Sequence, residues 1–134
     1  MILVDSTVWI DLLRARQTVP VARLRKLLEL GDAAAAPVVA QEVLQGAVNP
    51  AAFAKLREYF SGIPLLGALR AVDLHIAAAD LYARARWRAI TPRSAHDCLI
   101  AAIAVEEGVP LLHDDRDFER LATVERRLKL IPRA

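Results

Sequence analysis

The chain has 134 residues, of which 55% are hydrophobic and only 5% aromatic, and its formal net charge is +2. This length predicts one domain with a core of its own, and so small a charge gives little support to a polyanionic partner. No apolar run approaches the roughly 18 residues of a membrane span, no signal peptide is visible, and the single Cys98 excludes an internal disulfide, so we expect a cytoplasmic protein.

Short apolar strands alternate with helices along the whole chain. Strands are predicted at residues 2–4, 33–36, 63–66, 109–112 and 128–131, the last at a sheet edge, and helices at residues 8–16, 20–30, 37–47, 50–61, 72–88, 95–107 and 117–122. This alternation is typical of a parallel sheet between helical layers. We therefore predict an α/β fold, a three-layer α/β/α sandwich with a central, mainly parallel sheet of four or five strands, as a single domain over residues 1–134.

The first strand ends at a carboxylate. Its apolar run, Ile2-Leu3-Val4, is typical of a strand buried in the middle of a parallel sheet, and Asp5 follows it directly. Ligand sites in open α/β sheets lie at the carboxyl ends of the strands, so Asp5 is a candidate site residue. The alternative is that Asp5 only caps the next helix.

Three further acids lie where a charge is costly. Glu42 and Asp97 lie among apolar helical residues, and Asp115 follows the strand at 109–112. A carboxylate in such a place must be paired, protonated or bound to a cation, and for each acid alone a structural ion pair with an arginine is the alternative. All four acids can project over one rim of the predicted sheet.

Carboxylates that converge in this way favour a divalent metal, because they repel one another unless a cation neutralises them. The sequence has no cluster of histidine and cysteine for zinc, and oxygen ligands alone favour Mg²⁺ or Mn²⁺. Such an ion, with open coordination positions, is suited to phosphodiester chemistry.

Four segments occur in an order and at spacings that are typical of a known family: LVDSTVWI at 3–10, EVLQG at 42–46, DCLIAAIA at 97–104 and HDDRDF at 113–118. With these segments the whole chain resembles the PIN-domain ribonucleases, and most closely the VapC-type toxins of bacterial and archaeal toxin–antitoxin operons. The sequence departs from the family at residues 88–92, where many relatives carry a glycine before the third acid.

The resemblance implies a PIN-like fold and Mg²⁺- or Mn²⁺-dependent endonucleolytic cleavage of RNA. It also implies a homodimer that a cognate VapB-type antitoxin holds inactive, in a heterotetramer or larger assembly. Carried over residue by residue, the catalytic, metal-binding acids would be Asp5, Glu42, Asp97 and Asp115. Asp117 would be an accessory metal ligand, and Thr7 a hydroxyl that orients Asp5 or a water.

Basic residues around the acidic rim are the expected RNA contacts: Arg93, Arg116, Arg14 and Arg16. The segment Arg84-Ala85-Arg86-Trp87-Arg88 could hold RNA by charge and stacking, but a solvated helix face with Trp87 in the core or in a dimer seam is favoured. An antitoxin segment would use an apolar wall near the first helices, for which the candidates are Trp9, Leu12, Leu13, Leu24 and Leu28. The alternative is that most of these residues belong to the core.

Three other interpretations compete with this one. A receiver domain needs an acid pair after its first strand, whereas Asp5 stands alone there, and a haloacid-dehalogenase-like phosphatase needs a second Asp where Thr7 lies. The third is a PIN-like module that binds RNA or a protein without cleaving, and the sequence leaves it open.

Overall fold

The computed structural model describes all 134 residues, Met1–Ala134, and has a four-stranded parallel sheet at its centre. Its strands are β1 (Ile2–Val4), β2 (Ala33–Ala34), β3 (Leu111–Leu112) and β4 (Leu130–Ile131), in the spatial order β2-β1-β3-β4. Leu3 pairs with Ala34 on one side and with Leu111 on the other, so β1 is an inner strand. Because all pairings are parallel, the carboxyl ends of β1 and β3 lie at the same rim.

Seven helices surround the sheet: α1 (Ser6–Leu13), α2 (Val19–Leu30), α3 (Pro37–Leu44), α4 (Pro50–Ser61), α5 (Ala71–Trp87), α6 (Ala95–Glu107) and α7 (Arg116–Val124). Several begin at side-chain caps of the expected kind. The side chains of Thr18 and Asn49, for example, accept hydrogen bonds from amides in the first turns of α2 and α4.

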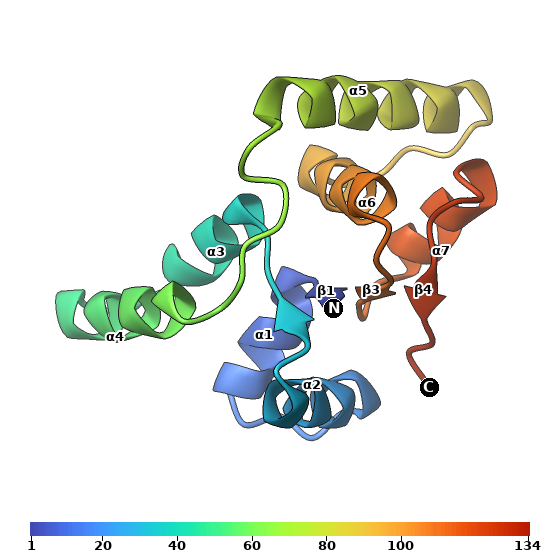
Figure 1. Cartoon of the computed structure of the whole chain (residues 1–134). Helices are drawn as coiled ribbons and strands as arrows, with labels where there is room; N and C mark the ends of the chain where they lie inside the picture. Colours follow the sequence, from blue (N-terminus) through green and yellow to red (C-terminus); the bar gives the residue numbers. More distant parts are fainter.

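Helices cover both faces of the sheet (Figure 1). α5 and α6 lie together on one side, and α1 and α2 lie on the other, which confirms the predicted α/β/α sandwich. α4 extends away from the rest of the molecule and buries only Phe60, whose ring packs edge-on against Trp9 at a centroid distance of 5.3 Å.

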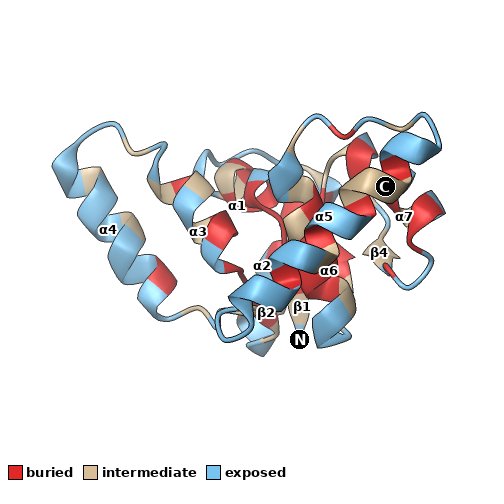
Figure 2. Cartoon of the chain, turned by 90° about the horizontal axis from the view of Figure 1, so that it is seen from above, coloured by how far each residue is buried: buried red, intermediate tan, exposed pale blue.

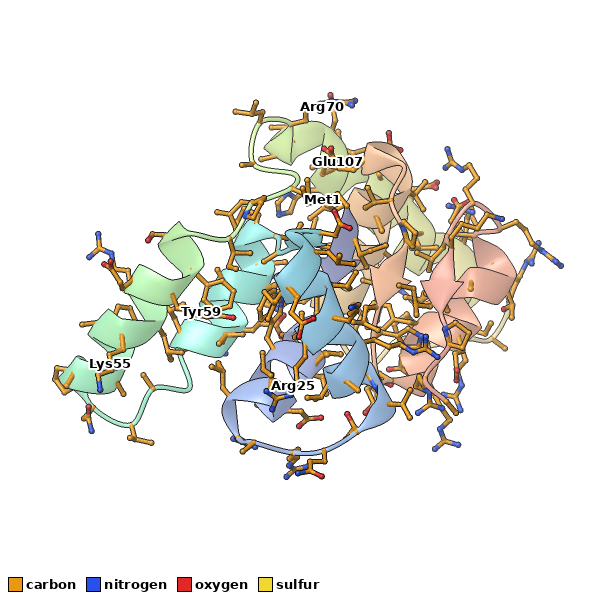
Figure 3. The ribbon with its side chains drawn as sticks, turned by 60° about the horizontal axis from the view of Figure 1, so that its bottom comes forward. Met1, Arg25, Lys55, Tyr59, Arg70 and Glu107 are labelled. Atoms are coloured by element: carbon orange, nitrogen blue, oxygen red, sulfur yellow. The ribbon has the colours of Figure 1, made fainter.

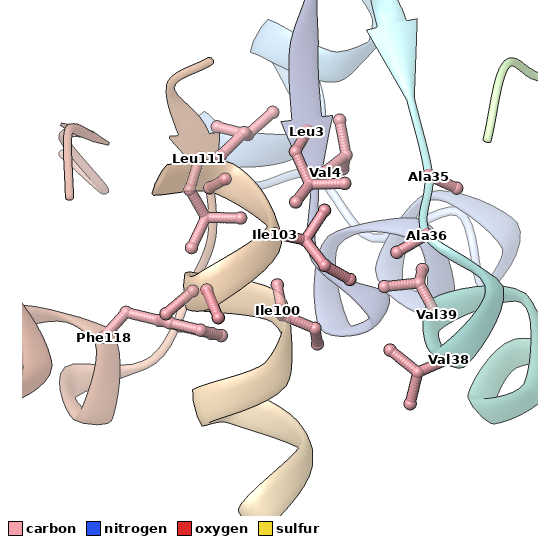
Figure 4. Close-up of a cluster of buried hydrophobic side chains, with 14 of the residues drawn as sticks. Leu3, Val4, Ala35, Ala36, Val38, Val39, Ile100, Ile103, Leu111 and Phe118 are labelled. Atoms are coloured by element: carbon pink, nitrogen blue, oxygen red, sulfur yellow. The ribbon is translucent and has the colours of Figure 1, made fainter. Parts of the chain in front are cut away.

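The core is aliphatic, as the composition predicts. Leu3 and Val4 of β1 face Ile100 and Ile103 of α6, with Leu111 alongside (Figure 4). The buried residues gather around the sheet and α6, whereas most of α4 is exposed (Figure 2). Charged side chains such as Arg25, Lys55 and Glu107 are exposed at the surface (Figure 3). No helix combines the length and hydropathy that a membrane crossing requires.

The strand predicted at residues 63–66 is wrong in extent. The segment makes a single parallel bridge, between Leu65 and Ala35, beside β2. Pro64 has no amide hydrogen to donate to a ladder, and Leu65 is 45% exposed, so the segment neither pairs nor packs as a full strand.

The loop before α6, where the sequence departs from the family, contains a residue with an unusual backbone conformation. Ala89 adopts a φ of 61°, in the left-handed region that glycine occupies freely and that costs another residue about 1 kcal/mol. The chain therefore keeps at this loop a conformation that glycine would adopt without strain.

The two tryptophans have opposite environments. Trp9 is fully buried and its indole nitrogen donates to the carbonyl of Val4 at 3.1 Å, and Leu24 is also fully buried. Neither can contribute to an apolar wall for an antitoxin. Trp87 is 78% exposed, which corrects its placement in the core.

Candidate metal centre

Asp5 lies where β1 ends and α1 begins, and it is only 3% exposed. It is the N-cap residue of α1, but its side chain makes no capping hydrogen bond, so capping does not explain the buried acid. Burial raises the pKa of Asp5 to about 6, and the negative charges of Glu42 and Asp115 contribute. The hydroxyl of Ser6 donates weakly to Asp5 at 3.4 Å, whereas Thr7, the predicted partner, is exposed.

Asp97 lies in the first turn of α6, where the negative charges of the other acids at the rim act on it. Burial, together with the negative charges of Asp5, Asp115, Asp117 and Glu42, raises its pKa to about 7. These through-space effects show that acids from four separate parts of the chain lie near one another.

Asp115 and Asp117 lie at the start of α7, beyond the end of β3. The Asp115 carboxylate caps α7 by accepting the amide of Asp117 at 2.9 Å. Oxygen atoms of Asp97, Asp115 and Asp117 all lie within 4.8 Å of one another, a spacing that one cation could bridge.

Glu42 of α3 lies near Asp5 and Asp97, whose pKa values its charge raises, but neither Glu42 nor Asp5 belongs to the group of three within 4.8 Å. Its Oε1 is buried and has no hydrogen-bond partner in the protein, and its Oε2 lies 3.9 Å from Nδ1 of His96. A buried carboxylate oxygen without a partner is costly, and a bound cation would remove that cost. This oxygen and the raised pKa values of Asp5 and Asp97 fit a site for a hard divalent cation, because every donor offered is oxygen.

One arginine reaches into this cluster. Arg93 donates from Nη2 to Asp115 at 2.8 Å and from Nε to Asp117 at 3.0 Å. For Asp115 and Asp117, the alternative explanation from the sequence applies: each forms an ion pair with an arginine. Asp5, Glu42 and Asp97 have no guanidinium partner, so ion pairing does not account for the cluster as a whole.

The other three arginines expected at the rim are exposed and make no contact with the acids. Arg14 and Arg116 are exposed, and Arg16 pairs with Asp11 at 3.7 Å. The sequence reasoning missed two features: Ser6, which is buried against Asp5, and His96, which lies near Glu42. The position of Ser6 next to a buried strand could have indicated the first, whereas the second depends on how α3 and α6 pack.

The structure defines the chain as an α/β protein with a cluster of carboxylates at the rim of its parallel sheet. Comparison with known proteins gives the family. The PIN domain family matches residues 2–124, and the chain belongs to this family.

Over 126 residues the chain is 36% identical to VapC ribonuclease Mb1587 of Mycobacterium bovis, with 92% of this chain and 93% of that protein aligned. It has the same identity and coverage with Ribonuclease VapC11 of Mycobacterium tuberculosis. Among solved structures, FitAcB from Neisseria gonorrhoeae has a TM-score of 0.69 at 20% identity, over 98% of this chain and 97% of that one. FitAB bound to an IR36 DNA fragment has a TM-score of 0.68 at 18% identity, over 98% and 94%. At these identities the two structures show a common fold.

Proposed function

We propose that this chain is a metal-dependent endoribonuclease of the VapC type, which hydrolyses RNA phosphodiester bonds in the cytoplasm and is neutralised by a cognate VapB-type antitoxin. The relatives named VapC ribonuclease support the reaction. The observation that carries the proposal is the buried, unpartnered Oε1 of Glu42 in a cluster where burial and mutual repulsion raise the pKa values of Asp5 and Asp97.

The residues that would hold Mg²⁺ or Mn²⁺ are Asp5, Glu42, Asp97 and Asp115. When bound, such an ion lowers the pKa of a water molecule and neutralises charge that develops on the phosphate. With a pKa of about 7, the Asp97 carboxyl is partly protonated at neutral pH without a metal, and it would release that proton to bind a cation. Thr7 is the expected accessory hydroxyl.

No histidine is placed to act as the general base. His113 is 1% exposed, and its Nδ1 bonds to the backbone of Asp115. His96 reaches only Glu42. The carboxylates themselves would therefore orient the attacking water, for an in-line displacement that leaves 5′-phosphate and 3′-hydroxyl ends.

RNA would be held by exposed guanidinium groups around the acids: Arg93, Arg116, Arg14 and Arg16. Because such contacts release counter-ions, RNA binding should weaken as salt increases, and Arg93→Ala should reduce that salt dependence.

The proposal is tested by cleavage of a labelled single-stranded RNA in Mn²⁺ with purified Asp5→Asn and Asp97→Asn variants. Both keep the shape of the side chain but remove a ligand charge, so we expect cleavage to fall by at least about 100-fold. Glu58→Gln is the matched control, because Glu58 is an exposed acid on α4, outside both the acidic cluster and α5.

Retention of cleavage by both variants would disprove the mechanism. If the wild-type protein neither gains thermal stability from Mn²⁺ nor cuts RNA, the chain is instead the inactive PIN-like module.

The antitoxin is the second proposed partner. Of the wall residues predicted near the first helices, Leu13 is 44% exposed and Leu12 and Leu28 are half-buried, so only these remain available for contact. Co-purification of the chain with the product of a neighbouring small reading frame, and loss of cleavage in that complex, would support this partner.

We also propose a homodimer that forms through α5. Val72 and Ile76 of α5 are 74% and 64% exposed and share one face of the helix. Beside this face lies a cavity of about 590 Å³ with a largely apolar lining that includes Ala71, Leu74 and Leu99. Val72 and Ile76 form a ridge, and the cavity beside them forms a groove. Such a surface is self-complementary, because a two-fold axis places the ridge of each copy in the groove of the other.

A further inference from the structure

Two carboxylates of the acidic cluster share one guanidinium. Arg93 contacts Asp115 through Nη2 and Asp117 through Nε, and its backbone amide also donates to Asp117 at 3.3 Å. The Arg93 side chain is nevertheless 73% exposed. The guanidinium thus lies at the solvent-exposed side of the cluster, and its Nε and Nη2 point toward the acids.

The two contacts are not equivalent. Asp117 is 3% exposed, and both of its oxygens face cations: Oδ2 accepts from Arg93, and Oδ1 lies 3.7 Å from Nη1 of Arg120. Arg93 and Arg120 lower the pKa of Asp117, against the effect of burial. The charge of Asp117 is therefore balanced by two guanidinium groups without a metal ion, although its Oδ1 accepts no hydrogen bond.

Asp115 is the exchangeable contact. Its Oδ1 takes the hydrogen bonds of Arg93 and of the Asp117 amide, and its side chain is 27% exposed. A solvent-screened contact of one guanidinium contributes little, and a doubly charged cation attracts the same carboxylate about twice as strongly.

We propose that Arg93 is an internal counter-ion of the acidic cluster, anchored on Asp117: it occupies Asp115 while no divalent cation is bound, and it turns to the RNA phosphate when a cation takes Asp115. The inference rests on the proposed function. It makes Asp117 a positioning residue, in place of the accessory metal ligand that the sequence suggested.

The first test measures Mn²⁺ affinity by calorimetry in the absence of RNA. Arg93→Gln removes the competing cation, so we expect Mn²⁺ to bind about three- to tenfold more tightly than in the wild type. Arg126→Gln is the matched control for net charge, because Arg126 is also exposed but lies outside the cluster. Arg93→Lys keeps the charge but cannot span both carboxylates, and we expect an intermediate affinity.

The second test separates an anchor from a ligand. Asp97→Asn should weaken Mn²⁺ binding by at least about 30-fold, whereas Asp117→Asn should change it by less than about threefold. For RNA affinity, measured in Ca²⁺ as the hard cation, Arg93→Gln and Asp117→Asn should each weaken binding. The double variant should be no weaker than Arg93→Gln alone, because Asp117 acts through Arg93. A merely structural role for Asp117 would give additive losses.

The outcomes distinguish this inference from the function on which it rests. If the wild type binds Mn²⁺ and cuts RNA, but Arg93→Gln binds Mn²⁺ no more tightly than Arg126→Gln, the counter-ion role is wrong and the nuclease proposal stands. A loss of Mn²⁺ binding in Asp117→Asn as large as that in Asp97→Asn would make Asp117 a ligand and overturn the anchor. If the wild type binds no Mn²⁺, both proposals fail.

Discussion

Two acids show how neighbours decide the state of a carboxyl group. Burial and four nearby negative charges raise the pKa of Asp97 to about 7. The pKa of Glu125, which is 7% exposed, falls to about 2, chiefly because Arg127 donates to it. The fold stabilises the ionised form of Glu125, whereas it destabilises the ionised form of Asp97. Such a destabilised charge is typical of a site where a bound ligand offsets the unfavourable free energy.

Asp97→Asn tests whether the Asp97 charge destabilises the folded chain. At neutral pH and without metal, removal of the repelled charge should raise the Tm by about 3–6 °C. The wild type should gain Tm when Mn²⁺ is added, and the variant should lose that gain because a ligand is missing. Differential scanning calorimetry of both proteins, with and without Mn²⁺, measures the two effects. A variant that is less stable than the wild type without metal would contradict the argument.

At the scale of elements, the sequence predicted what local patterns determine. The helices, the inner strand β1 and the edge position of β4 follow from apolar periodicity and capping residues. The four main acids of the site follow from their positions after strands or on apolar stripes. Contacts that depend on packing could not be predicted: the pairing of Arg93 with Asp117, and the approach of His96 to Glu42, join residues from different elements. The pattern at residues 63–66 resembled a strand, and only the partner geometry shows that it is not one.

A second such contact joins α5 to the end of α7. Arg84 of α5 donates to Glu125 at 3.0 Å, and Arg127 donates to the same carboxylate at 3.0 and 3.1 Å. Glu125 is buried although it carries a charge. The ion pair between Arg84 and Glu125 therefore joins residues that are 41 positions apart in the chain.

This contact predicts how stability depends on pH. The pKa of Glu125 is lower in the folded chain, at about 2, than its ordinary 4.5, so its stabilising effect is present above pH 4.5 and is lost as pH falls toward 2. Glu125→Gln should lower the free energy of unfolding at neutral pH by about 1–3 kcal/mol, since the exposed Arg127 is partly screened. Urea unfolding at several pH values should show that the difference from the wild type shrinks below pH 4.5. Glu58→Gln, on the exposed face of α4, is the control and should behave like the wild type.

At the scale of the whole molecule, the exposed apolar residues are not spread evenly. The acidic cluster occupies the rim of the sheet, whereas Leu69, Val72, Ile76 and Trp87, at 64 to 97% exposed, lie on or next to α5. Figure 1 shows α5 as the outermost layer above α6, so this face has nothing packed on it within one chain. Exposed apolar side chains on one helix are typical of an interaction site, and the neighbouring groove gives the same surface a complementary shape.

Ile76→Glu tests the dimer that this face would form. In a two-fold contact the new charge enters the interface twice, close to its own copy, so one substitution introduces two buried carboxylates that repel each other. We expect the wild type to elute as a dimer in size-exclusion chromatography with light scattering, and the variant as a monomer with an unchanged far-ultraviolet circular dichroism spectrum. Val48→Glu places the same charge at an apolar residue that is 89% exposed in the loop before α4, and it should remain dimeric. A wild type that is monomeric at every concentration would remove α5 as the interface, and a dimer that survives Ile76→Glu would place the contact on another face.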